Sequence, residues 1–173
     1  MKAEGIYLKI QDASGLFDGF NSYMNSSSSK DLVFPVIDGS EVQIADYMFS
    51  NVMAKSFSGF LNFGNIKSAR QMFSYCRVLD GTIPEFDSSK IEQAESMFNE
   101  TSCTKPIPDL DFSSVIHADS MFRCSHVFDN GYDFGKIKFP NATCCSHAFR
   151  GIETVGEGAS AFKCSNLTLP KVT

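Results

Sequence analysis

The 173-residue sequence contains no tryptophan, few charged residues and no long hydrophobic run. Charged residues make up 20% of the chain and hydrophobic residues 43%, a balance that argues against both a disordered tail and a membrane protein. No apolar stretch approaches the roughly 20 residues that span a bilayer. The formal net charge of −5 supplies no basic surface for phosphate backbones. We therefore expect no nucleic-acid partner and no membrane insertion.

Motifs of catalysis are also missing. The sequence has no glycine-rich phosphate loop and no nucleophile elbow, and none of its three histidines stands beside such a motif. We therefore expect no enzyme and no cofactor. The segment after Met1 lacks the apolar core of a secretory signal, so we expect reduced thiols, with one disulfide as the alternative for a protein that works outside the cell.

An internal repeat organises the chain. The dipeptide Met-Phe recurs at a nearly constant interval, with its phenylalanines at Phe49, Phe73, Phe98 and Phe122. An alanine stands four residues before each Phe, and a β-branched residue stands seven before. Weaker units extend the array: Phe17, Phe20 and Met24 fit the columns of Val42, Ala45 and Phe49, and Ile137, Ala142, Cys145 and Phe149 fit after a slightly longer step.

The spacing within one unit predicts two elements. Offsets −7, −4, −1, 0 and +3 from the Phe lie on one face of a helix, and segments such as 82–86 alternate like a short strand. We therefore expect an α/β repeat solenoid of about six to seven units of roughly 24–25 residues. It would form one domain over 1–173, with an N-terminal cap at 1–15, repeat units at 16–149 and a shortened C-terminal unit and cap at 150–173.

The repeated columns are typical of a core. Stacked Phe rings would form a ladder, the alanines would permit close layers, and the methionines would fill gaps beside the rings. Most cysteines would be small buried hydrophobes. A zinc site that combines Cys124 and His126 with Cys144, Cys145 and His147 is the alternative, and a zinc-dependent hydrolase on Cys124, His126, Cys145 and His147 would follow from it. Because those residues fall in different repeat registers, we do not expect them to meet.

An aspartate also recurs, at Asp38, Asp87 and Asp111. A residue that returns in each unit indicates a turn or cap element more than a catalytic base. Such a ladder could also bind calcium, although the glycine-rich spacing of calcium-binding solenoids is absent. We expect no metal.

The motifs resemble those of BspA-type leucine-rich repeat proteins. The similarity lies in VQIADYMFSN (42–51), IKSARQMFSYCRVLDGTIPEFD (66–87), VIHADSMFRCSHVF (115–128) and ASAFKCSNLTLPKV (159–172). It covers residues 16–172, although Val52 replaces the repeated Cys in the first unit and Cys103 is displaced in the third. The resemblance implies an atypical leucine-rich repeat with one strand face and one helical face.

Members of that family are mostly bacterial surface proteins that adhere to host molecules or other cells, and similar arrays occur in bacteriophage proteins. The resemblance therefore implies a non-enzymatic binding or structural protein. Because no export signal is visible, we favour a phage-encoded virion component of the tail or capsid that contacts proteins. A bacterial cell-surface adhesin with a host receptor is the alternative, and a cytoplasmic scaffold is a third. The partner would be a protein, with a glycan as a further option.

Exposed strand positions would form the binding surface. The residue between the proline column and the next apolar column should point outward, which gives Val36, Phe60, Glu85 and Asp109. The segment 56–66 is rich in Phe, and Phe57 and Phe60 form either an exposed partner patch or a locally thicker core. Tyr132, in the longer unit, poses the same question. Our candidate partner surface is Val36, Phe57, Phe60, Glu85, Asp109 and Tyr132.

Overall fold

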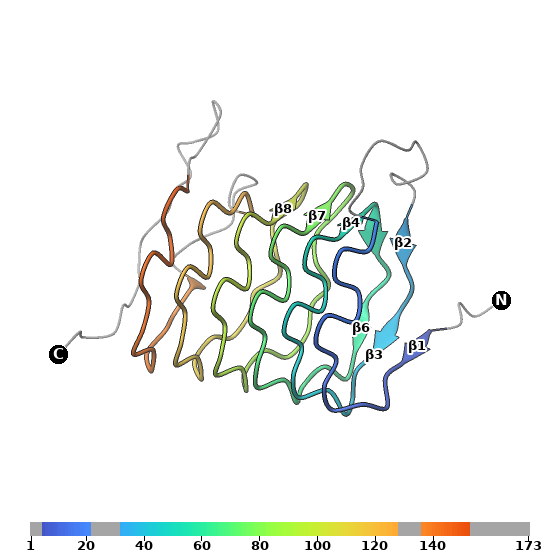
Figure 1. The fold of residues 1–173 in the computed structure, drawn as a ribbon, viewed down its shortest axis with the longest axis horizontal. Helices are drawn as coiled ribbons and strands as arrows, with labels where there is room; N and C mark the ends of the chain where they lie inside the picture. The colour runs from blue at the N-terminus through green and yellow to red at the C-terminus, as the bar shows by residue number, and fades with distance from the viewer. Residues whose placement is uncertain (1–4, 22–31, 128–135, 153–173) are drawn as a thin grey trace.

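The structure is a computed structural model that describes residues 5–21, 32–127 and 136–152. Successive segments of the chain lie side by side as parallel coils, so that the stack runs from the N-terminal to the C-terminal end (Figure 1). One ladder of parallel bridges joins six coils through Asp12, Ile44, Ser68, Gln93, His117 and Cys144. The coils therefore repeat in register, with nearly equal steps in the middle of the array, from Ile44 to His117.

Within the described ranges, the strands are short and pair in parallel in three small sheets. They are β1 (Ile6–Tyr7), β2 (Val33–Phe34), β3 (Ile37–Asp38), β4 (Met53–Ala54), β5 (Ser56–Phe57), β6 (Phe60–Leu61), β7 (Arg77–Val78) and β8 (Ser102–Cys103). The sheets have the orders β1-β3-β6, β2-β5 and β4-β7-β8. Each strand pairs with strands of neighbouring coils, since no coil carries enough hydrogen-bonding edge to stand alone.

The prediction of an α/β solenoid built from strand-plus-helix units is wrong. No α-helix occurs among the described residues, and the segments expected to be helical are ribbons of successive turns. Within the ribbon 45–51, some N–H groups donate to the carbonyl three residues earlier, as Met48 does to Ala45 (3.2 Å). Alternate N–H groups instead cross to the next coil, as Tyr47 does to Arg70 (2.8 Å). A helix would have used these donors internally.

Positive φ angles mark the ribbons at every fourth residue. A type II turn requires a positive φ at its third residue, and a residue in that conformation interrupts a helix. The residues concerned are Gly15, Gly19, Tyr47, Asn51, Gln71, Tyr75, Ser96, Glu100, Ser120, Cys124, His147 and Gly151. A four-residue turn period places apolar residues at nearly the same offsets as a helix of 3.6 residues per turn. The hydrophobic pattern therefore could not separate the two.

The predicted Phe ladder is confirmed. Consecutive rings lie nearly parallel: the Phe73 ring is 5.6 Å from that of Phe49 and 5.7 Å from that of Phe98, with interplanar angles of 6° and 3°. The ladder continues from Phe98 to Phe122 and on to Phe149. The alanine column is buried beside it, as are the methionines that precede the rings. Stacking the coils thus forms one continuous apolar core.

The upstream alignment of Phe17 with the column of Val42 is wrong. Asp12 bridges Ile44, so the first step is longer than those that follow, and Phe17 stacks on Phe49 (5.3 Å). Met24 lies outside the described residues. The longer step accommodates an insertion that the fixed spacing did not anticipate. The downstream alignment is confirmed, because Cys144 bridges His117 and the Phe149 ring stacks in the ladder. The end of the predicted C-terminal unit, 153–173, lies outside the described residues.

The phenylalanine-rich segment 56–66 forms a thicker core. Phe60 pairs with Ile37 and is only 9% exposed, so the expectation that it faces outward is wrong. Because side chains alternate along a strand, burying Phe60 turns its neighbour Leu61 to solvent, 51% exposed. Gly39 makes room for the next ring, since a Cβ there would lie 2.5 Å from Cζ of Phe63.

Candidate functional site

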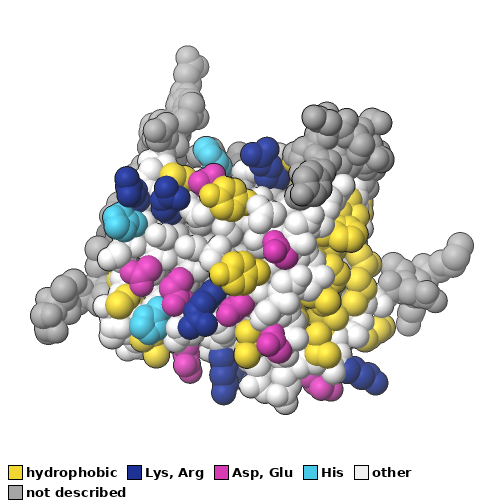
Figure 2. Space-filling model, in the orientation of Figure 1, with side chains coloured by type: hydrophobic (Ala, Val, Ile, Leu, Met, Phe, Trp, Pro, Cys, Tyr) yellow, Lys and Arg dark blue, Asp and Glu magenta, His cyan; other side chains and the backbone are white. Residues whose placement is uncertain are grey.

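The outward side of the turn ribbons is the most regular surface of the molecule, and we call it the ribbon face. Its segments, each beginning at a residue of the bridge ladder, are 12–19, 44–51, 68–75, 93–100, 117–124 and 144–151. Side chains two residues apart on an extended chain share one face. The residues of the bridge ladder therefore form one column on this face, and the residues two positions later in the sequence form a second column beside it. The second column is Asp46, Arg70, Glu95, Asp119 and Ser146. Figure 2 shows this face, on which acidic, basic and isolated apolar side chains alternate.

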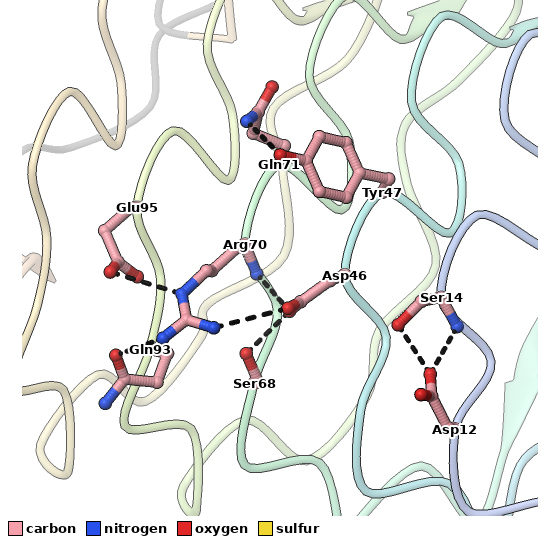
Figure 3. Close-up of polar contacts among 9 residues, drawn as sticks. All are labelled: Asp12, Ser14, Asp46, Tyr47, Ser68, Arg70, Gln71, Gln93 and Glu95. Atoms are coloured by element: carbon pink, nitrogen blue, oxygen red, sulfur yellow. Dashed lines mark hydrogen bonds and ion pairs between the residues drawn. The ribbon is translucent and has the colours of Figure 1, made fainter.

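Arg70 is the centre of a polar network across three coils (Figure 3). Its guanidinium lies 3.5 Å from Oδ2 of Asp46 in one neighbouring coil and 3.3 Å from Oε1 of Glu95 in the other. Nη2 also donates to Oε1 of Gln93 at 2.9 Å. The second oxygen of Asp46 accepts from the Ser68 hydroxyl (2.6 Å) and from the Arg70 backbone (2.9 Å). The network holds the exposed side chain of Arg70 in a fixed position.

Two tyrosines stand on the same face. Tyr47 is 42% exposed and Tyr75 45% exposed, yet each phenol is tied to the following coil. Gln71 Nε2 donates to the Tyr47 hydroxyl at 2.9 Å, and the Tyr75 hydroxyl donates to Oε1 of Glu100 at 3.1 Å. The rings are therefore presented to solvent with their hydroxyl groups already positioned.

A different cluster lies further along the ribbon face. The ligand atoms of His117, Asp119 and Cys144 all lie within 4.8 Å of one another. His117 and Asp119 are half-buried, and Cys144 is exposed. Oδ1 of Asp119 accepts the backbone N–H of Ser146 at 2.9 Å. Imidazole, carboxylate and thiolate are all metal ligands, so these three residues could hold an ion.

The four residues of the earlier zinc hypothesis do not form such a group in the part of the chain described. Cys124 lies against Gly151, where a Cβ would be 2.7 Å from its Sγ. Cys145 packs toward the core from the alanine column, and burial, then the charge of Asp119, raise the pKa of its thiol. Burial likewise raises the pKa of the Cys76 and Cys103 thiols.

The recurring aspartates act as turn elements, as expected. Oδ1 of Asp87 accepts the backbone N–H and the hydroxyl of Ser89, at 3.0 and 2.6 Å. These bonds, the hydroxyl one first, lower the pKa of Asp87. Asp38 and Asp111 accept the same backbone bond from the residue two positions on. Such Asx turns explain why the residue returns once per coil.

The five candidate partner residues that the structure describes do not form one surface. Phe60 is in the core, and Phe57 is half-buried with its ring stacked on Phe34 at 4.9 Å. Val36 is also half-buried, whereas Glu85 is exposed. The exposed Asp109 pairs with Lys136 at 2.7 Å beside an open hollow of about 530 Å³. Tyr132 lies outside the described residues. A partner role for these positions remains a prediction.

The residues of the ribbon face escape a search for repeats, because their columns vary from coil to coil. The register is nevertheless visible in the sequence, since Ser68, His117 and Cys144 all stand five residues before the core Phe of their coil. An apolar area also lies at the N-terminal end of the stack (Figure 2). Strand β1, at that end of the stack, carries Tyr7, which is 70% exposed. No helix among the described residues has the length and apolar character needed to cross a membrane.

Fold and surface together define a repeat protein of stacked parallel coils with a continuous ordered face. The family model described as "Mycoplasma protein of unknown function, DUF285" matches residues 43–162. The chain belongs to this family, which is associated with BspA-like surface repeat proteins. Comparison of the chain with curated proteins and with solved structures gave no match.

Proposed function

We propose that the chain is a non-enzymatic binding protein that presents its ribbon face to a protein partner. One observation carries the proposal: exposed Tyr47, Tyr75 and Arg70 are all fixed by hydrogen bonds between coils. Tyrosine and arginine are the side chains that most often dominate binding energy at protein interfaces. Side chains that are already ordered lose less conformational entropy on binding. The face is therefore prepared for a partner rather than for a reaction.

The location of the partner is part of the proposal. The location that we favour is a virion, in contact with capsid or tail proteins. The association of the family with surface repeat proteins supports the alternative, a bacterial cell-surface adhesin whose ligand is a host protein or a glycan. Both locations require an exposed, regular surface, and the ribbon face supplies one.

Quantitative mass spectrometry of purified particles and of cell-envelope fractions from the native source separates the two locations. A stoichiometric amount with capsid and tail proteins supports the virion. Recovery with the envelope and not with particles supports the adhesin. Recovery only in the cytosol contradicts both.

The binding face is tested by photocrosslinking in the same source. A photoreactive phenylalanine replaces Tyr75 on the ribbon face or, as a matched control, Tyr7 on β1, which is more exposed. We expect a discrete cross-linked protein from position 75 and none from position 7. The double variant Tyr47→Ala/Arg70→Ala should weaken capture of that protein at least tenfold, since two anchors worth about 1–2 kcal/mol or more are lost. Equal cross-linking at both positions would contradict the assignment of the face.

A further inference from the structure

We propose that His117, Asp119 and Cys144 form a binding site for a divalent metal ion of the Zn²⁺ class. The site lies on the ribbon face and joins two neighbouring coils. It is independent of the proposed partner binding, since it needs neither tyrosine nor Arg70. Cys144 belongs to the zinc motif considered from the sequence, whereas His117 and Asp119 do not.

The fold itself brings the three residues together. His117 and Cys144 are partners in the parallel bridge ladder, so their side chains emerge side by side from adjacent coils. Asp119 follows His117 by two residues and lies on the same side. The hydrogen bond from the Ser146 backbone to Oδ1 of Asp119 (2.9 Å) holds the carboxylate over the coil that carries Cys144. The meeting of imidazole, carboxylate and thiol thus follows from the register.

An equivalent position earlier in the stack shows what is unusual here. Asp46 stands in the same column as Asp119, and its Oδ1 likewise accepts a backbone N–H from the next coil (2.9 Å). There the Ser68 hydroxyl and the guanidinium of Arg70 complete the surroundings of the carboxylate.

At the later position Cys144 replaces that serine, and Ser146 replaces the arginine. Among the described residues, Asp119 forms no ion pair. In this part of the chain, no side chain supplies to Asp119 the positive charge that Arg70 supplies to Asp46. Asp119 lies instead beside two further metal-ligand groups, the His117 imidazole and the Cys144 thiol. A bound cation would restore the charge balance.

The donor set selects the chemical class of the ion. One nitrogen, one oxygen and one sulfur ligand suit Zn²⁺, and the thiol disfavours Ca²⁺ and Mg²⁺, which prefer oxygen alone. Tetrahedral zinc requires ligand atoms roughly 3.5 Å apart, so the side chains would close by about 1 Å. The fourth position is open to water. Binding converts the Cys144 thiol to a zinc-bound thiolate and releases its proton to solvent.

The test uses the full chain, purified without a metal-affinity tag, reduced and freed of metal by chelation. Co²⁺ replaces Zn²⁺ as a probe, because a thiolate bound to cobalt gives a charge-transfer absorption band that water-bound cobalt lacks. We expect one equivalent of Co²⁺ to produce the band and Zn²⁺ to abolish it by displacement. Cys144→Ser should remove the band, and His117→Ala should weaken binding about tenfold or more.

Cys145→Ala is the matched control, since it removes the adjacent thiol and places alanine in a column where the other coils carry it. This variant should bind Co²⁺ like the wild type. A second measurement is the urea midpoint, which Zn²⁺ should raise in the wild type but not in Cys144→Ser, because metal bound to the native state stabilises it. Cys144 is exposed, so the unliganded variant should fold normally.

Three results would overturn the proposal. They are absence of the band at a large molar excess of Co²⁺, persistence of the band in Cys144→Ser, and its loss in Cys145→Ala. Failure of partner cross-linking at position 75 has no bearing on any of them, so the two proposals fail separately.

Discussion

The central ring of the Phe ladder offers the strongest test of how the stack is held together. Phe98 is fully buried and lies between two parallel rings, those of Phe73 at 5.7 Å and Phe122 at 5.3 Å. Replacing a buried Phe by Ala costs about 3–5 kcal/mol through lost burial and the cavity left behind. Since the ring stacks on both sides, we expect Phe98→Ala to lower the free energy of unfolding by about 4–5 kcal/mol.

Phe98→Leu separates volume from stacking. Leucine fills much of the space, so most of the cavity term disappears, but both ring contacts are lost at about 0.5–1.5 kcal/mol each. We expect a loss of about 2 kcal/mol. Urea unfolding followed by circular dichroism measures both variants, and with a slope of about 2 kcal/mol per M the Ala variant should shift the midpoint by about 2 M.

The exposed Leu61 supplies the control, because Leu61→Ala also removes a large apolar side chain but leaves no buried cavity. Its cost should stay within about 0.5 kcal/mol. If Phe98→Ala costs no more than this control, the ladder is not the core of the stack. If Phe98→Leu is as stable as the wild type, stacking adds nothing beyond volume.

Three other predictions concern the turns, the acid response and the thiols. Ser96 has a φ of 54°, a conformation that a β-branched side chain disfavours. Ser96→Val should therefore lower the free energy of unfolding by about 1–2 kcal/mol in the same urea assay. Hydrogen bonds from Ser89 lower the pKa of Asp87, so their stabilisation is present above the unfolded value of about 3.9 and is lost as pH falls through the folded value. Ser89→Ala should therefore raise the pKa of Asp87 in an NMR titration and make unfolding less sensitive to acid. Iodoacetamide should modify exposed Cys144 in the folded protein and buried Cys76 only after unfolding, as peptide mass spectrometry reports.

Each of these has its own control. Ser102→Val, in the extended strand β8, should not destabilise, because β-branched residues suit strands. Equal losses at 96 and 102 would show that positive φ is not the cause. An unchanged acid midpoint in Ser89→Ala would contradict the role of the Asx turn. Modification of Cys103 as fast as Cys144 would contradict its burial.

The core could be predicted from the sequence because the same residue types are needed at the same positions of every coil. Every coil must contribute a ring and an alanine at the same place, so Phe73 and Ala69 recur as columns that self-comparison detects. The conformation that carries those columns could not be predicted. Spacings of three and four residues fit both a helix and a turn ribbon, and the choice depends on whether N–H groups such as that of Phe73 bond within the segment or to the next coil.

The candidate metal site was beyond the same method for the opposite reason. His117 and Cys144 occupy a column in which no residue type recurs, so nothing marks them in a comparison of repeats. Their proximity depends on exact register across the lengthened step between their two coils, which only the three-dimensional pairing establishes. Similarly, the register of β6 differs by one residue from the predicted register, so that Phe60 faces the core and Leu61 faces solvent.

The direction of the hydrogen bonds between ribbons gives this layer of the stack an electrical polarity, which N–H groups such as those of Gln43 and Lys67 oppose in part by donating toward the N-terminal side. In the ribbon 45–51, the N–H groups of 45, 47, 49 and 51 all donate toward the C-terminal side, and those of 69, 71, 73 and 75 do the same. Ordinary sheets have small net dipoles because the contributions of their strands alternate. Here the peptide dipoles of every ribbon add, as in a helix, with the positive end toward the C-terminal coil. The two ends of the described ribbon layer are therefore chemically unlike: carbonyl oxygens of the ribbon 13–19 point away from the stack, and N–H groups of the ribbon 145–151 point away from it at the other end.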